Sequence, residues 1–222
     1  MKVLLFGATG MVGQGVLREC LLDPEVEQVL SVVRAPSGAA HEKLRERVHA
    51  DFFDWSALES ELRGFDACFF CLGVSSAGMK EADYHRVTYE LTLGAANLLA
   101  RGNPQMVFVY VSGAGTDSTE KGRSMWARVK GKTENALRAL PFKAVYLFRP
   151  GFIQPLHGIK SKTRLYRALY VAAVPLVPLV RALAPGAVTT TEKVGRAMLV
   201  VAKRGAPKPF IENRDINELG AA

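Results

Sequence analysis

The chain has 222 residues, enough for one well-buried α/β domain with little left for a second. Its hydrophobic content of 49% and charged content of 23% are ordinary for a globular protein. A formal net charge of +8 is compatible with binding to nucleic acid. However, the basic residues are spread along the chain and form no recognised binding motif, so we expect no nucleic-acid partner. Three cysteines are too few for a disulfide framework.

The apolar stretches predict neither a signal peptide nor a membrane span. The apolar start of the chain leads at once into the first strand and lacks a cleavage pattern. The longest apolar stretch, residues 168–180, is too short to cross a bilayer and contains Pro175 and Pro178. We therefore expect a cytoplasmic protein.

The first fourteen residues predict a strand, a glycine turn and a helix. Val3–Phe6 is a short apolar run typical of a buried strand, Gly7, Gly10 and Gly13 follow, and a helix-compatible stretch covers Gln14–Leu22. The first glycine permits a tight turn, the second lets backbone approach a pyrophosphate, and the third lets the helix pack on the strand. The helix N-terminus then offers its N–H groups to the anion. A glycine-rich turn without a ligand is the alternative, but this context favours dinucleotide binding. The predicted contacts here are Gly7, Thr9, Gly10, Met11, Val12 and Gly13.

The second predicted strand, Glu27–Val33, ends at Arg34, where an NAD-selective domain would carry Asp or Glu. A carboxylate there binds the ribose 2′-hydroxyl and repels a 2′-phosphate, whereas a guanidinium attracts the phosphate. The alternative is that Arg34 is an ordinary solvated charge. We expect NADP as the cofactor, in preference to NAD.

The next segment predicts a helix, a strand and a second helix. His41–Arg47 is a charged helical patch, and Val48–Phe52 is typical of a third strand. Trp55–Leu62 is expected to be a helix with Ser56 as its N-cap and Glu59 in the capping-box position.

The rest of the chain alternates between the two kinds of element. Strands are expected at 67–72, 106–111, 144–148 and 209–212, and helices at 84–100, 125–140 and 191–203. This alternation predicts an α/β fold with a doubly wound parallel sheet. Ligands bind such sheets at the carboxyl ends of the strands. The loops expected to converge there are residues 7–13, 34–35, 72–76, 112–117 and 149–157.

We expect one dinucleotide-binding domain over residues 1–222, with residues 151–190 as a small lid that covers the substrate. From Gly158 on, the lid segment carries a basic run of Lys160, Lys162, Arg164 and Arg167, and the apolar stretch follows.

Cys68 and Cys71 have the spacing of a redox motif, but they lie within a predicted strand. Three residues apart on a strand, two side chains point to opposite faces. We therefore interpret both as core cysteines and predict no metal site.

The chain resembles the short-chain dehydrogenase/reductase superfamily at several motifs in register. The glycine motif is similar to that of the extended and atypical branches, and the strand ends carry Leu72-Gly73, Val111-Ser112-Gly-Ala and Phe148-Arg-Pro-Gly151. Within the superfamily it most resembles the atypical group that includes Tat-interacting-protein-like and NAD-dependent epimerase/dehydratase-like proteins. Asp51-Phe52 and Val129-Lys130-Gly131 are also similar to that group. The cofactor contacts that the resemblance implies are Asp51, Phe52, Leu72, Gly73, Lys130, Pro150 and Gly151. From its position alone, Asp51 could bind the adenine amino group or cap a turn.

In that superfamily a serine, a tyrosine and a lysine four residues later carry the chemistry. Ser112 matches the serine, Lys130 matches the lysine, and Trp126 replaces the tyrosine. A tyrosine phenol beside an ammonium can exchange a proton with substrate, whereas an indole N–H is no usable acid in water. Lys130 can still bind the nicotinamide ribose hydroxyls, as the resemblance implies. The alternatives are a turn-capping role for Ser112 and a solvated charge at Lys130.

Two classes of function follow. The first is an NADP-dependent oxidoreductase or epimerase of an unknown small carbonyl or hydroxyl substrate, in which another group supplies the proton. Residues on or near the crevice that could do so, though each is better explained as structural, are Tyr84, His85, Tyr110, Cys71 and His157. The second is a non-catalytic protein that senses NADP(H) and acts through a homodimer or a protein partner.

Overall fold

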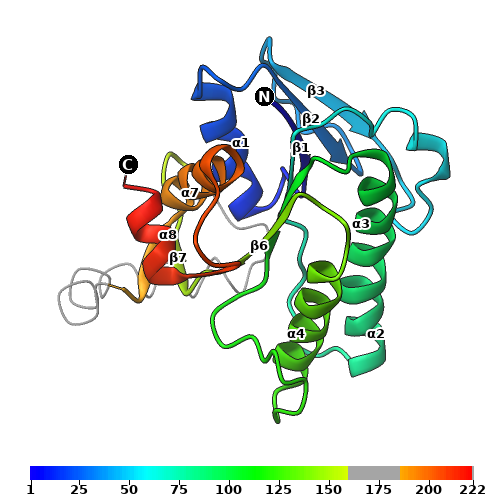
Figure 1. Cartoon of the computed structure of the whole chain (residues 1–222), viewed down its shortest axis with the longest axis vertical. Helices are drawn as coiled ribbons and strands as arrows, with labels where there is room; N and C mark the ends of the chain where they lie inside the picture. The colour runs from blue at the N-terminus through cyan, green and yellow to red at the C-terminus, as the bar shows by residue number, and fades with distance from the viewer. Residues whose placement is uncertain (160–185, 222) are drawn as a thin grey trace.

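The computed structural model describes residues 1–159 and 186–221 of the chain, which form a parallel sheet with helices on both faces (Figure 1). The strands of this sheet are β1 (Lys2–Phe6), β2 (Gln28–Val33), β3 (Leu44–Val48), β4 (Ala67–Phe70), β5 (Val107–Val111), β6 (Ala144–Arg149) and β9 (Phe210–Glu212). Their order is β3-β2-β1-β4-β5-β6-β9, and every neighbouring pair is parallel. The predicted doubly wound sheet is therefore confirmed. Its strand order reverses between β1 and β4, which is where such sheets bind ligands.

Two further strands and eight helical elements of several kinds complete the described residues. β7 (Phe152–Gln154) and β8 (Val188–Thr190) form a small parallel pair that the sequence did not predict. The helical elements are α1 (Met11–Leu22), the 3-10 turn η1 (Ser56–Leu58), α2 (Glu81–His85), the π-helical turn η2 (Arg86–Glu90), α3 (Leu91–Gly102), α4 (Met125–Arg138), α7 (Thr191–Arg204) and α8 (Asn213–Leu219). Helices α1 and α7 pack together on one face of the sheet, and α3 and α4 cover the other (Figure 1). The helix α8 also was not predicted.

The core divides into two halves because successive strand residues point to opposite faces. On β1, Val3 and Leu5 belong to the half beneath α1 and α7, whereas Leu4 and Phe6 belong to the half beneath α3. All four side chains are fully buried. The sheet is thus covered on both sides, as a parallel sheet requires.

The helix predicted at residues 41–47 is wrong, because most of this segment is strand β3. Leu44–Val48 pairs along its length with β2 and forms the edge of the sheet. Its charged side chains are mostly exposed. Charge along an outer strand discourages pairing with other chains, so the composition suits an edge as well as a helix.

The strand predicted at residues 48–52 and the helix predicted at residues 55–62 are also wrong. β3 ends at Val48, and only the short turn η1 is helical in the second segment. The Ser56 side chain does not cap this turn; instead its backbone N–H donates to the Asp54 carboxylate over 2.9 Å. A local side-chain hydrogen bond of this kind competes with helix formation.

Cys68 and Cys71 are free thiols on opposite faces of the sheet, as predicted. No helix within residues 1–159 and 186–221 is long and apolar enough to cross a bilayer. The basic run and the apolar stretch of the predicted lid lie outside the described residues.

Candidate functional site

The turn after β1 requires glycine at two positions. Gly7 has a φ of +82°, and a Cβ there would lie 2.8 Å from the carbonyl carbon of Cys71 at the end of the neighbouring strand. At Gly13 a Cβ would lie 2.0 Å from the carbonyl oxygen of Gly7. These two glycines let β1, α1 and the chain after β4 approach one another closely.

Gly10, by contrast, is much less enclosed than Gly7 and Gly13. Among the described residues, a Cβ at Gly10 would meet only the Gly7 carbonyl oxygen, at 3.3 Å. Gly10 is the N-cap of α1, and the first helical hydrogen bond runs from Gln14 N to Gly10 O. The N–H groups of Met11, Val12 and Gly13 therefore precede the first helical bond and have no acceptor within the helix. An open face at the positive end of a helix fits a pyrophosphate.

The glycine turn and the N-terminus of α1 form the predicted phosphate cradle. A pocket of about 630 Å³ lies beside this cradle. It is lined by Ala8 and Thr9 of the glycine turn, by Gln14 and Leu17 of α1, and by the loop that begins at Arg34. The Gln14 amide donates to the Thr9 carbonyl over 3.1 Å and so braces the turn against the helix. The exposed Arg34 guanidinium therefore shares one pocket with the cradle, as the predicted 2′-phosphate contact requires.

Asp51 and Phe52 lie after the end of β3. The Asp51 carboxylate accepts a hydrogen bond from the Phe53 N–H at 2.9 Å, so it forms the turn that was the alternative interpretation. Phe52 is buried and meets Trp55 edge to face at 5.1 Å between ring centroids. A contact from Asp51 to adenine stays a prediction.

The loop after β4 connects the glycine turn to Lys130. Leu72 N would lie 2.9 Å from a Cβ at Gly7, and a Cβ at Gly73 would lie 3.9 Å from Lys130 Nζ. Gly73 itself is exposed. Residues 72 and 73 therefore line the space between the predicted phosphate cradle and the predicted ribose-binding lysine.

Lys130 is a buried ammonium, not a solvated charge. It lies on α4 with 6% of its surface exposed, and Nζ donates to the Tyr110 hydroxyl and to the Val111 carbonyl, both at 3.1 Å. Burial lowers the pKa of Lys130 to about 8, and the nearby Glu134 carboxylate opposes this shift. Burial also raises the pKa of Tyr110 well above its ordinary value, so this phenol keeps its proton at neutral pH.

Ser112 follows β5, and its hydroxyl is held by Glu134. The Ser112 Oγ lies 2.5 Å from Glu134 Oε1 and 3.1 Å from the Phe148 carbonyl oxygen, and its single hydrogen can be donated to one of them at a time. While that hydrogen is donated to either acceptor, the hydroxyl can only accept a hydrogen bond from a ligand.

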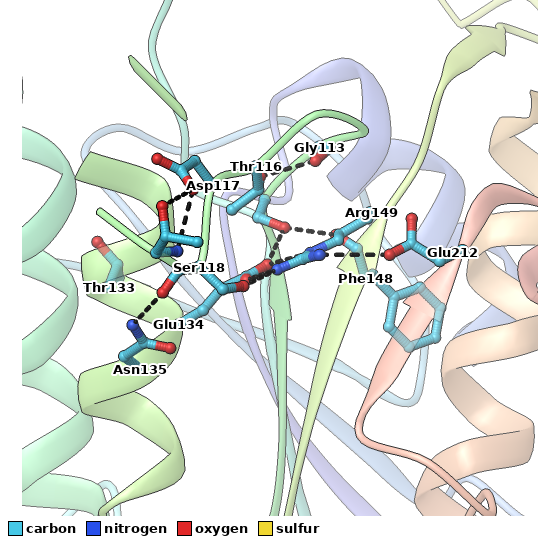
Figure 2. Close-up of polar contacts among 12 residues, drawn as sticks. Gly113, Thr116, Asp117, Ser118, Thr133, Glu134, Asn135, Phe148, Arg149 and Glu212 are labelled. Carbon is cyan, nitrogen blue, oxygen red and sulfur yellow. Dashed lines mark hydrogen bonds and ion pairs between the residues drawn. The ribbon is translucent and has the colours of Figure 1, made fainter. Parts of the chain in front are cut away.

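Glu134 is fully buried and is paired with Arg149 (Figure 2). Arg149 Nε donates to Glu134 Oε1 over 3.0 Å, and its terminal nitrogen makes a second, closer bond to Oε2. Arg149 also reaches Ser118 at 2.6 Å and Glu212 at 3.3 Å. The hydrogen bond with Glu134 raises the pKa of Arg149, which stays protonated. The sequence reasoning missed Glu134, although its position one helical turn after Lys130 was an available signal.

Trp126 packs over the loop that follows β5. A Cβ at Gly113 or Gly115 would lie 3.9 Å or 3.6 Å from its indole ring. The side chain is half-buried, on the first turn of α4. Ser112, Trp126 and Lys130 thus gather around one strand end, but no phenol occupies the position of Trp126.

Pro150 and Gly151 connect the loops at the far side of the site. The Pro150 carbonyl accepts from Ala114 N at 2.9 Å, and the Gly151 N–H donates to the Asn213 side chain over 2.7 Å. A Cβ at Gly151 would lie 2.7 Å from the Ala187 carbonyl oxygen. Their contacts to a cofactor stay predictions.

The other residues near the crevice that could supply a proton have structural surroundings, as their better explanation requires. His157 pairs with Glu192 at 2.5 Å, and the His85 ring stacks on Tyr89 at 4.7 Å between centroids. Tyr84 is buried on α2, and Cys71 is partly buried at the end of β4.

Sequence comparison identifies relatives over most of the chain. The sequence model of a family described as NAD(P)H-binding matches residues 7–153. The mitochondrial protein fmp52 of Emericella nidulans is 32% identical over 159 residues, which are 68% of this chain and 66% of that protein. The mitochondrial protein FMP52 of Saccharomyces cerevisiae is 29% identical over 167 residues, covering 74% of this chain and 69% of that protein. The chain thus spans about two thirds of the length of these relatives.

Structural comparison finds the same fold in several enzymes of known structure. The Bordetella bronchiseptica enzyme WbmF in complex with NAD+ has a TM-score of 0.67 at 18% identity, over 98% of this chain and 76% of that one. The UDP-glucose 4-epimerase of Thermotoga maritima has a TM-score of 0.63 at 15% identity, over 90% and 73% of the two chains. These likenesses bear on the fold alone.

The comparisons also correct one expectation. The fungal relatives are named as mitochondrial proteins, which contradicts the prediction of a cytoplasmic location.

Proposed function

Because the chain belongs to the NAD(P)H-binding family and is an atypical relative of the NAD-dependent epimerases and dehydratases, we propose that it is an NADP(H)-dependent oxidoreductase or epimerase. Its substrate would be a small carbonyl or hydroxyl compound. The observation that carries the proposal is that the open face of Gly10, the Arg34 pocket and the Lys130 ammonium all lie at the carboxyl edge of the central strands.

Each part of this edge would hold one part of the dinucleotide. The N-terminus of α1 would bind the pyrophosphate through its N–H groups, and Arg34 would pair with the 2′-phosphate. Lys130 would donate to the nicotinamide ribose hydroxyls from beside Gly73. When bound, NADPH supplies a hydride, and the chain must orient the substrate and manage the proton.

The site lacks an evident group that would exchange a proton with the substrate. Trp126 replaces the phenol that would exchange it, and the hydroxyl hydrogen of Ser112 is held within the protein. General acid–base assistance is worth about 10²–10⁴-fold in rate. We therefore expect slow reduction of ordinary carbonyl compounds by the wild-type protein, by about that margin.

Trp126→Tyr is expected to increase NADPH-dependent reduction, because it restores a phenol on the same helix face as Lys130, four residues away. The test measures NADPH oxidation with a panel of aldehydes and ketones. Trp126→Phe is the matched control, since it changes the ring without adding a hydroxyl, and should show no gain. Wild-type turnover at rates ordinary for this superfamily would show that Trp126 is no obstacle and that another group is the acid.

A second candidate is a non-catalytic NADP(H) sensor that acts through a partner protein or a second copy of the chain. The observation that favours it is the commitment of Ser112 to Glu134, which leaves no hydrogen for a substrate carbonyl. For a sensor, Trp126→Tyr should give no gain with any member of the panel while NADPH binding is retained.

A further inference from the structure

Glu134 lies at the centre of a polar cluster that includes Ser112 and Arg149. We infer that Glu134 is a positioning residue that joins Ser112 and Lys130 into one unit and sets the charge that Lys130 presents at the site. The functional meaning of this charge rests on the proposed binding of NADP(H). The physical coupling does not, and it can be measured in the protein alone.

The geometry of α4 places both groups on one face. Lys130 and Glu134 are four residues apart, so their side chains project in the same direction, toward the ends of β5 and β6. Lys130 reaches the Val111 carbonyl, and Glu134 reaches the hydroxyl of the next residue, Ser112. One turn of α4 therefore makes hydrogen bonds with two consecutive residues at the end of β5, Val111 and Ser112.

Arg149 compensates the charge of this buried carboxylate. An isolated buried carboxylate would be neutralised or would destabilise the fold. The guanidinium of Arg149 instead binds both oxygens of Glu134 and is itself held by Ser118 and Glu212 (Figure 2). The carboxylate beside Lys130 is therefore paired with a guanidinium through both of its oxygens.

The charged and titratable groups around Lys130 come from four elements. Glu134 of α4 and Tyr110 of β5 interact with Lys130 directly. Tyr84 of α2 interacts with Tyr110. Arg149 of β6 lies behind Glu134. The phenol of Tyr110 is neutral because burial raises its pKa, so Glu134 is the anion that acts on Lys130. Burial lowers the pKa of Lys130 to about 8, and without Glu134 this pKa would be lower still.

The test is an NMR titration of the Lys130 side chain in the protein without cofactor, with Lys130→Met used to assign the signal. The wild-type midpoint is expected near pH 8. In Glu134→Gln the midpoint should fall by about one pH unit, because an opposite charge within a few ångströms shifts a pKa by roughly 1–3 units. Glu212→Gln, which removes the outer and half-exposed partner of Arg149, should leave the midpoint unchanged.

A double variant keeps the test valid if Glu134→Gln folds poorly. Glu134→Gln with Arg149→Met removes both members of the buried pair and leaves no unpaired buried charge. Its Lys130 midpoint should also lie below that of the wild type. An unchanged midpoint in both variants would overturn the inference, as would an equal shift in Glu212→Gln.

NADPH affinity provides the functional arm. In the wild type it should weaken as pH rises through about 8, since Lys130 loses its charge there, and in Glu134→Gln the weakening should begin at lower pH. If the wild-type protein fails to bind NADPH, the proposed function is wrong, while the NMR titration still decides the role of Glu134.

Discussion

Gly10→Val is expected to weaken NADPH binding by at least about a hundredfold while the protein stays folded. The valine side chain would occupy the open face where the pyrophosphate meets backbone, so several charge-assisted hydrogen bonds at the α1 N-terminus would be lost. Each such bond contributes about 1.5–3 kcal/mol, and about 2.7 kcal/mol corresponds to a hundredfold. Calorimetric titration measures the affinity, and circular dichroism checks the fold.

The neighbouring glycine supplies the control for this prediction. Gly13→Ala adds only a methyl group, but it would place it 2.0 Å from the Gly7 carbonyl oxygen, which is backbone and cannot turn aside. Overpacking of this kind costs about 1–3 kcal/mol or more, so Gly13→Ala should lower the free energy of unfolding. Gly10→Val should lower it far less. A folded Gly10→Val protein that binds NADPH as tightly as the wild type would show that the phosphates lie elsewhere.

Arg149→Met is expected to lower the free energy of unfolding by about 3–5 kcal/mol. It removes the partner of a fully buried carboxylate and leaves the charge of Glu134 uncompensated. Urea denaturation monitored by circular dichroism measures the change. The double variant with Glu134→Gln should recover most of the loss, because the cost lies in the unpaired charge.

An exposed arginine in a similar pair is the matched control. Arg214 pairs with Glu218 one turn along α8 at 2.9 Å, and its side chain is 84% exposed. Arg214→Met should change the free energy of unfolding by no more than about 0.5 kcal/mol, since exposed pairs contribute little. Equal effects of Arg149→Met and Arg214→Met would mean that burial of Glu134 does not matter.

The sequence predicted the parts of the fold whose signals are local. The glycine turn is one, because Gly13 is required by its contact with Gly7 only six residues earlier, although Gly7 is also required by the chain after β4. The central strands are another, since their continuous apolar runs need no knowledge of neighbours. β3 failed for the opposite reason. Its sequence, Leu44-Arg-Glu-Arg-Val48, is compatible with a helix, and only pairing with β2 makes it a strand.

In the candidate site too, residues with a local sequence signal were predicted, and a residue whose role depends on a distant partner was missed. Ser112 and Lys130 were predicted from motifs, and the structure brings them to one strand end. Glu134 was missed because its role depends on Arg149, which the sheet order brings to it from β6. No spacing along the chain reveals that encounter. The small pair β7 and β8 depends in the same way on residues far apart in sequence.

We propose above that the chain binds NADP(H) with Arg34 on the 2′-phosphate. Calorimetric titration of NADPH and NADH into the wild type, Arg34→Ala and Arg45→Ala tests it most directly; Arg45 is an exposed arginine on β3 that does not line the pocket. We expect the wild type to bind NADPH about ten- to a hundredfold more tightly than NADH. Arg34→Ala should lose this preference, and Arg45→Ala should keep it. Equal affinities of the wild type for the two dinucleotides, or an undiminished preference in Arg34→Ala, would show that Arg34 does not select the 2′-phosphate.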